Sequence, residues 1–281
     1  MNTHIDLRPV SVERRTDGSG PRVLLLHGLA AGDSVWDRTL PLLPDTYQLW
    51  TARLPWRTET IADWGEQPNL RGWLAKALTA VPGGPEVVVA HSMAANVLLD
   101  LLDQKQRGGV DALRRFGIRA LVLVSPFYRA DAQEFDWNTI SYYLNDFHLI
   151  MEEGIRAHSG GRFSADVQHA MGLRVRDRVG PYGWFRFFDL YLRTPTLETG
   201  RITVPTLVLG GEADFAARPE ESLALARALP DAAARVLAGG HFPMLEAAED
   251  FAAEVSSFVN STVGLPLQRK AAPLNALEPQ R

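Results

Sequence analysis

The sequence of 281 residues contains no cysteine. Disulfide bonds, thiolate metal sites and cysteine nucleophiles are therefore excluded, and a reducing compartment is compatible with the composition. No run reaches the roughly eighteen apolar residues of a membrane span, and the N-terminus lacks the apolar core of a signal peptide. The net charge is −4 without a long run of either sign, so neither nucleic acid nor a membrane is expected as a partner. These features predict a cytoplasmic protein.

Short apolar runs alternate with helix-like segments along much of the chain. They show no alternation of apolar and polar residues, as expected of strands that are covered on both faces. This pattern predicts an α/β fold with a mostly parallel central sheet and helices on both faces. Residues 5–15 are a candidate antiparallel edge strand. The predicted parallel strands lie at 22–27, 47–52, 86–90, 119–125, 204–210 and 234–238.

One interval breaks this alternation. Between residues 127 and 201 no convincing strand occurs, and this interval is too long for a simple connection. Helical patterns cover 138–158, 165–179 and 181–193. We expect a helical cap at 127–201, inserted into a core formed by 1–126 and 202–262, before the strand that carries the candidate acid. A C-terminal tail at 263–281, with three prolines, is expected to be loosely ordered.

The predicted cap is rich in aromatic residues. Of the 25 Phe, Trp and Tyr residues in the chain, 14 lie between Phe127 and Tyr191. Two interpretations stay open: these rings form the core of a small helical unit, or some of them line an apolar pocket over a site. The candidate pocket residues are Trp56, Phe127, Tyr128 and Phe242.

Ser92 lies where the run "VVVAH" ends and the helical run "MAANVLLDLL" begins. A serine in this position could be a helix N-cap or a nucleophile. The N-cap interpretation explains the hydroxyl, but not the small residues Ala90 and Ala94 on either side of it. A side chain on a tight strand-to-helix turn is held clear of the sheet, and the helix N-terminus favours developing negative charge.

A serine nucleophile needs a base, and the base needs an acid to orient it. His241 follows the last predicted strand in "LAGGHFPMLE", and Asp214 follows the previous one in "LVLGGEADF". The order Ser92, Asp214, His241, each after a different strand, occurs in one known triad architecture. Asp131 and Asp136, after the strand before that, are alternative acids.

Together these motifs resemble the α/β-hydrolase fold family over residues 20–262. "LLLHGLAAGDSVW" resembles the oxyanion loop of the family, "AHSMA" its nucleophile elbow, "GGEAD" its acid loop and "GGHFPMLE" its histidine loop. The resemblance implies an oxyanion hole formed by the backbone N–H groups of Leu29 and Met93. The sequence departs from the family in "ARLPWRTET", where Trp56 and Thr58 stand at positions that are commonly glycine.

These observations predict a serine hydrolase that cleaves a carboxylic ester, thioester or lactone through an acyl-enzyme. The expected substrate carries an apolar acyl chain, for example a polyketide-like one, and is either a small molecule or bound to a carrier. No metal or organic cofactor is expected, since no histidine pair has ligand spacing and no phosphate-binding glycine loop follows a strand. Cleavage of a carbon–carbon bond, acyl transfer or rearrangement on the same triad, and a non-catalytic binding protein are the alternatives. The oligomeric state stays open.

Overall fold

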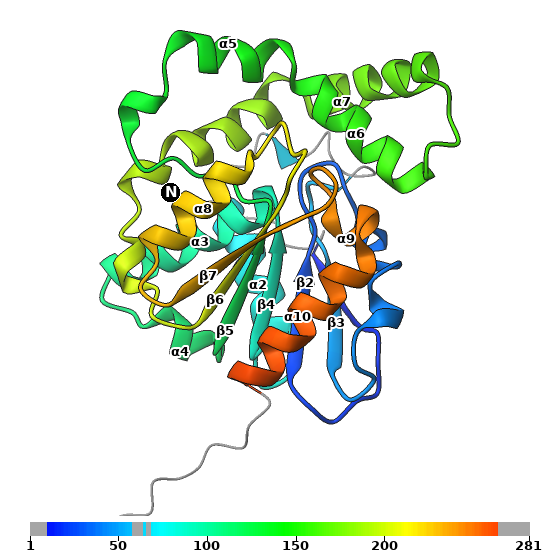
Figure 1. Ribbon diagram of the computed structural model, residues 1–281. Helices are drawn as coiled ribbons and strands as arrows, with labels where there is room; N and C mark the ends of the chain where they lie inside the picture. The colour runs from blue at the N-terminus through cyan, green and yellow to red at the C-terminus, as the bar shows by residue number, and fades with distance from the viewer. Residues whose placement is uncertain (1–9, 58–63, 66–68, 264–281) are drawn as a thin grey trace, which may run out of the picture.

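The computed structural model describes residues 10–57, 64–65 and 69–263. In this part of the chain seven strands form one sheet in the order β1-β3-β2-β4-β5-β6-β7 (Figure 1). Only β1 runs antiparallel to its neighbour, β3. The strands are β1 (Ser11–Arg14), β2 (Arg22–Leu26), β3 (Gln48–Arg53), β4 (Val87–His91), β5 (Ala120–Val124), β6 (Thr206–Gly211) and β7 (Ala232–Leu237).

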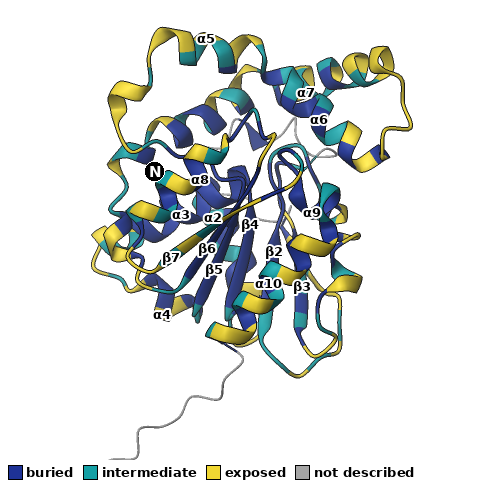
Figure 2. Ribbon diagram, in the orientation of Figure 1, coloured by how far each residue is buried: buried dark blue, intermediate teal, exposed yellow. Residues whose placement is uncertain are grey.

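The central strands are apolar at every position because both faces of the sheet are covered. Leu24 and Leu26 of β2 face one hydrophobic core, whereas Val23 and Leu25 of the same strand face the other. All four side chains are inaccessible to solvent. The sheet is accordingly buried along its centre in Figure 2. The predicted fold class, a mostly parallel sheet with helices on both faces, is confirmed.

Helices cover the two faces unequally. Leucines and alanines of α2, α3 and α8 pack in the first core, and α10 packs in the second. Outside residues 127–201, the described helices are α2 (Leu70–Ala80), α3 (Met93–Arg107), α4 (Ala112–Phe116), α8 (Pro219–Ala228), α9 (Pro243–Glu246) and α10 (Ala248–Thr262). None of the described helices is long and apolar enough to cross a membrane.

Three further helices lie between β5 and β6 in chain order: α5 (Trp137–Asn145), α6 (Phe147–Ser159) and α7 (Ala165–Leu192). Figure 1 shows them above one end of the sheet. Gly180, with φ of 63° and ψ of 176°, interrupts α7 just before Pro181, where the sequence pattern also divides. A glycine is suited to this position because it adopts positive φ without a steric penalty. We refer to residues 127–201 as the α5–α7 segment.

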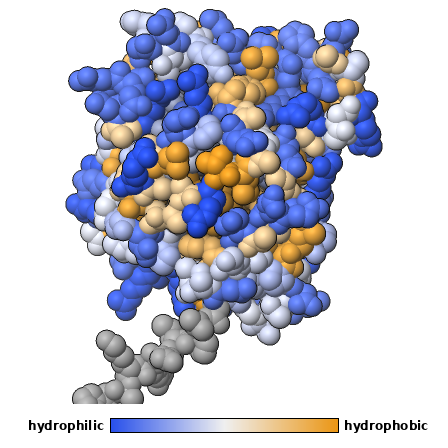
Figure 3. All heavy atoms as spheres, in the orientation of Figure 1, coloured by the Kyte–Doolittle hydropathy of each residue, from blue (hydrophilic) through white to orange (hydrophobic). Residues whose placement is uncertain are grey.

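The aromatic residues of the α5–α7 segment have three different surroundings. Phe127, Tyr143 and Tyr191 pack edge-on against one another. Trp137 and Tyr182, in contrast, are largely exposed. On the face drawn in Figure 3 hydrophilic residues predominate, and hydrophobic ones gather near its middle. Others, together with Phe127 itself, line a cavity that is described below. Of the predicted tail, only Val263 lies within the described residues.

Candidate active site

Ser92 joins β4 to α3 in a strained backbone conformation. Its φ of 54° and ψ of −126° lie outside the regions that side chains normally favour, and such strain is typical of a nucleophile on a sharp strand-to-helix turn. The backbone N–H of Ser92 donates to Val124 O over 2.8 Å and holds the turn on β5. A Cβ at Gly28 would lie 2.9 Å from Ser92 Cβ, so glycine is needed for this loop to approach the serine.

Ser92, His241 and Asp214 form a continuous hydrogen-bonded chain. The Ser92 hydroxyl lies 2.8 Å from His241 Nε2, and His241 Nδ1 lies 2.8 Å from Asp214 Oδ2. The second oxygen, Asp214 Oδ1, accepts the N–H groups of Ala216 and Ala217 over 2.9 Å each. These bonds fix the carboxylate, and the carboxylate in turn fixes the imidazole with Nδ1 protonated and Nε2 available as a base.

The two alternative acids, Asp131 and Asp136, accept hydrogen bonds from backbone N–H groups near them in the chain. Asp131 accepts the N–H of Gln133, and Asp136 accepts the N–H of Thr139, so each carboxylate caps the start of a helix. Both side chains are exposed. The geometry therefore pairs His241 with Asp214 and not with either of them.

A fourth residue, Glu153 of α6, contacts the histidine from above. Its Oε1 accepts the backbone N–H of His241 over 2.9 Å, and its side chain is buried. Any side chain at Gly240 would collide with this oxygen. Sequence reasoning missed Glu153 because it belongs to no motif. The only signal was the glycine pair before His241, which leaves room for a side chain from another element.

The charges around His241 act in opposite directions on its pKa. Burial alone would lower the pKa, but the Asp214 carboxylate, its hydrogen bond and Glu153 together raise it above the ordinary value. Burial also raises the pKa of Glu153. The site therefore favours the imidazolium once His241 has taken a proton.

His91, the residue before the serine, supports the histidine loop. Its Nε2 donates to the carbonyl oxygen of His241 over 2.9 Å. Burial, followed by repulsion from His241, lowers the pKa of His91 well below its ordinary range. A neutral His91 serves as a hydrogen-bond donor without adding a second positive charge beside His241.

The backbone around the two predicted oxyanion residues, Met93 and Leu29, is held by hydrogen bonds. Met93 is the first residue of α3, and the bonds to Ser92 O come from Ala95 and Asn96, further into the helix. The N–H of Met93 therefore precedes the intrahelical ladder, as at any helix N-terminus. Leu29 lies in the loop that Gly28 brings against Ser92, and Ala30 N–H donates to Trp56 O to hold that loop.

A cavity of about 750 Å³ opens above Ser92 and His241. Phe127 and Phe242 line it, as predicted for these two residues. The α6 and α7 helices provide much of the remaining wall, mostly with apolar side chains. These are Phe147, Ile150, Met151, Ile155, Met171, Val175 and Phe187. Arg162, Arg174, Asp177 and Arg178 also line it, and all four side chains are exposed.

Two of the predicted pocket residues are not among the residues that line this cavity. Trp56 is fully buried, and its indole N–H donates to His27 O over 3.2 Å. Tyr128 is also buried, and its backbone N–H donates to Glu221 Oε2 over 2.8 Å. Both residues therefore lie in the core and not on the wall of this cavity.

Glu221 itself is a buried carboxyl on α8. Besides the N–H of Tyr128, it accepts the hydroxyl of Tyr191 over 2.8 Å. Burial raises its pKa to about 8, against the ordinary 4.5, although both hydrogen bonds act in the opposite direction. This carboxyl joins α8 to Tyr128, near the start of the α5–α7 segment, and to Tyr191 in the last turn of α7.

Among the described residues, one group could hold a metal ion: His148, Glu152 and His169. The sequence spacing of the histidines indicated no such pair, because the two helices that carry them pack together only in the fold. This group lies in the α5–α7 segment and includes none of the residues that line the cavity above Ser92.

A family model described as the alpha/beta hydrolase family matches residues 23–254. The chain belongs to the alpha/beta hydrolase family. Comparison with curated proteins finds no match. This membership indicates that the protein is a hydrolase of this superfamily.

Several solved structures share the fold of this chain. The chain is similar to a bromoperoxidase from Bacillus anthracis, with 17% identity over 89% of this chain and 95% of that one and a TM-score of 0.61. It is similar to the enol-lactonase from Burkholderia xenovorans LB400, with 18% identity over 89% and 96% and a TM-score of 0.59. A thioesterase domain from the curacin biosynthetic pathway shows 17% identity over 88% and 94% and a TM-score of 0.54.

Proposed function

We propose that this alpha/beta hydrolase is a serine hydrolase that cleaves a carboxylic ester, thioester or lactone of an apolar acyl substrate. The observation that carries the proposal is the chain of two 2.8 Å contacts from Ser92 to His241 to Asp214 at the floor of a mostly apolar cavity. A serine N-cap would require none of these contacts.

The first half of the reaction forms an acyl-enzyme. Ser92 Oγ attacks the carbonyl carbon while its proton passes to His241 Nε2, and Asp214 stabilises the imidazolium. The N–H groups of Leu29 and Met93 bind the resulting oxyanion, and one such donor contributes about 3 kcal/mol to transition-state stabilisation. The tetrahedral intermediate collapses as His241 returns the proton to the leaving oxygen or sulfur.

The second half releases the acyl group. A water molecule gives a proton to His241 Nε2 and attacks the acyl carbon, and the ester bond to Ser92 Oγ breaks as the proton returns to that oxygen. Because burial and Asp214 hold one tautomer of His241, no reorientation of the ring is needed between the two halves.

The shape of the cavity supports an extended acyl chain. Apolar side chains of α6 and α7 surround the space above the serine, and the exposed side chains of three arginines and Asp177 also line this space. An apolar acyl group fits the apolar wall, and an anionic leaving group or carrier fits the arginines. The α5–α7 segment acts in this proposal as a cap over the site, and Glu153 acts as a positioning residue for His241.

A fluorophosphonate probe tests the proposal directly. We expect stoichiometric labelling at Ser92, located by peptide mass mapping, and no labelling in the His241→Ala variant. A folded protein that leaves Ser92 unlabelled would contradict the nucleophile assignment.

Substrate turnover distinguishes hydrolysis from transfer. A series of p-nitrophenyl esters with acyl chains of increasing length should show kcat/KM rising with chain length until the cavity is filled. In ¹⁸O-labelled water the released acid should carry one labelled oxygen from each turnover. A product without the label would instead indicate acyl transfer or rearrangement.

A further inference from the structure

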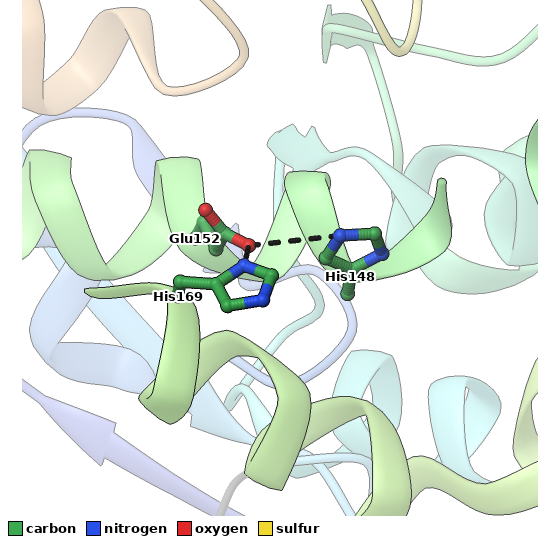
Figure 4. A group of neighbouring side chains, drawn as sticks. All are labelled: His148, Glu152 and His169. Atoms are coloured by element: carbon green, nitrogen blue, oxygen red, sulfur yellow. Dashed lines mark hydrogen bonds and ion pairs between the residues drawn. The ribbon is translucent and has the colours of Figure 1, made fainter. Parts of the chain in front are cut away.

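Outside the candidate active site, three side chains converge where α6 packs on α7 (Figure 4). His148 and Glu152 are four residues apart and share one face of α6, and His169 lies in the second turn of α7. One oxygen, Glu152 Oε1, lies 2.7 Å from His169 Nδ1 and 3.8 Å from His148 Nε2. One ligand atom of each residue lies within 4.8 Å of the others.

We propose that His148, Glu152 and His169 form a binding site for a divalent transition-metal ion, with zinc as the ion to test. Zinc binds imidazole nitrogen and carboxylate oxygen at about 2.0–2.2 Å, so tetrahedral ligand atoms lie about 3.3 Å apart. The two measured contacts of the carboxylate fall on either side of this separation. All three ligand atoms lie within 4.8 Å of one another, so the side chains must close by at most about 1.5 Å to enclose an ion.

The outer contact of His148 has the arrangement that metal-binding histidines commonly show. Its Nδ1 lies 3.2 Å from the carbonyl oxygen of Asn145 and donates to it. This bond leaves Nε2 unprotonated and directed toward Glu152, where its lone pair is available to a cation. A backbone carbonyl on the second nitrogen of the ring fixes both tautomer and orientation in metal sites.

The helix crossing itself depends on a glycine at this point. A Cβ at Gly172 would collide with Glu152 Cγ and would lie 3.2 Å from the carbonyl oxygen of His148. Because position 172 carries no side chain, α7 approaches α6 closely enough for His169, three residues earlier, to meet the carboxylate. The backbone thus places the three ligands independently of their mutual hydrogen bonds.

Exposure of the three side chains indicates an open site. His148 and Glu152 retain 16% and 21% of their side-chain exposure, whereas His169 retains 53%. The ion can enter past His169 and keep water in its remaining positions. Three protein ligands with water predict a dissociable ion. Since α6 and α7 both line the cavity, binding would tie together the two helices above Ser92 without contact to the triad.

Calorimetric titration of the metal-stripped protein with ZnCl₂ tests the proposal. We expect one equivalent bound in the micromolar range, together with a zinc-dependent rise in Tm, because a ligand that binds only the folded state stabilises it. His148→Ala, Glu152→Gln and His169→Ala should each weaken zinc binding about tenfold or more.

Two control variants test whether zinc binds at another histidine of the protein. His158→Ala removes another histidine of α6, and His241→Ala removes the histidine of the candidate active site; both should keep the zinc equivalent. Glu152→Gln preserves the shape of the side chain, and its circular dichroism and metal-free Tm show whether it is folded. No zinc bound at 1 mM, or unchanged affinity in folded Glu152→Gln, would overturn the proposal, as would loss of binding in either control.

Discussion

Two histidine–carboxylate pairs in this molecule have nearly the same geometry and opposite surroundings. His241 Nδ1 lies 2.8 Å from Asp214 Oδ2, with side chains that are 2% and 0% exposed. His169 Nδ1 lies 2.7 Å from Glu152 Oε1, with side chains that are 53% and 21% exposed. Hydrogen-bond length therefore does not distinguish the pair proposed for catalysis from the pair on the surface.

The two pairs differ in how much water surrounds them. Without water around Asp214, its field on His241 is weakly screened, and it raises the pKa of the histidine against the effect of burial. At the surface, water and salt screen such a pair, and its contribution to stability is typically below about 1 kcal/mol. The buried pair is thus rigid and strongly coupled, whereas the exposed pair is free to rearrange around a cation.

Asp214→Asn should have the largest effect. Asn Oδ1 can keep the bonds to Ala216 and Ala217, which leaves its NH₂ group facing His241 Nδ1 and favours the wrong tautomer. We expect kcat for a p-nitrophenyl ester to fall by about four powers of ten. Asp131→Asn and Asp136→Asn, in which a helix cap is changed, should leave kcat close to that of the wild type. A large loss in either of these instead would identify a different acid.

Glu221→Gln tests a buried carboxyl that has no histidine partner. The pKa of Glu221 is about 8 in the folded protein and 4.5 ordinarily, so the folded state retains a proton that the unfolded state releases. This carboxyl stabilises the fold fully below about pH 4.5, and its contribution is lost as the pH rises toward 8, by up to about 1.4 kcal/mol per pH unit.

Urea denaturation at several pH values measures this dependence. Between pH 5 and 8 the free energy of unfolding of the wild type should decrease relative to that of Glu221→Gln. Gln can accept the N–H of Tyr128 and donate to the oxygen of Tyr191, so the packing is kept. Parallel pH profiles for the two proteins would show that Glu221 is ionised in the fold.

Glu153→Gln should shift the pH profile of activity rather than abolish activity. Gln keeps an acceptor for the N–H of His241 but removes a negative charge that raises the pKa of the imidazole. The general base must be neutral, so the rising limb of kcat/KM should move to lower pH, by about one unit or less. Glu249→Gln, on the exposed side of α10, should leave the limb unchanged. An unmoved limb in Glu153→Gln would limit Glu153 to a packing role.

Glu152→Gln, in metal-free protein, should have the smallest effect. It breaks the exposed pair while preserving side-chain shape, and we expect the free energy of unfolding to change by less than about 1 kcal/mol. Urea denaturation in the presence of a chelator measures this change. A loss of several kcal/mol would mean that the surface pair is coupled to the core as strongly as the buried one.

The sheet and the placement of Ser92, Asp214 and His241 followed from the sequence because each motif ends a strand. Parallel strands end at the same edge, so residues far apart in the chain meet there without knowledge of side-chain packing. Glu153, Glu152 and His169 could not be predicted in this way. Their contacts depend on how α6 crosses α7 and the histidine loop, and neither crossing leaves a periodic signal.

Two of the predicted pocket residues lie outside the cavity above Ser92. Trp56 and Tyr128 follow strand ends, like true site residues, and their aromatic side chains suit a pocket. Both side chains, however, are buried in the core, where the indole of Trp56 donates to His27 O, and no sequence pattern reveals this placement. Trp56, which stands where glycine is common in the family, therefore contributes to the core beside His27.

The adjacent glutamates of α6 give this helix two attachments of different kinds. Glu152 faces α7, whereas Glu153 holds the backbone of His241. A displacement of α6 away from the sheet would lengthen the bond from His241 N–H to Glu153 and so disturb the loop that carries His241. In the proposed mechanism, the position of α6 and the alignment of the general base are therefore coupled through this one hydrogen bond.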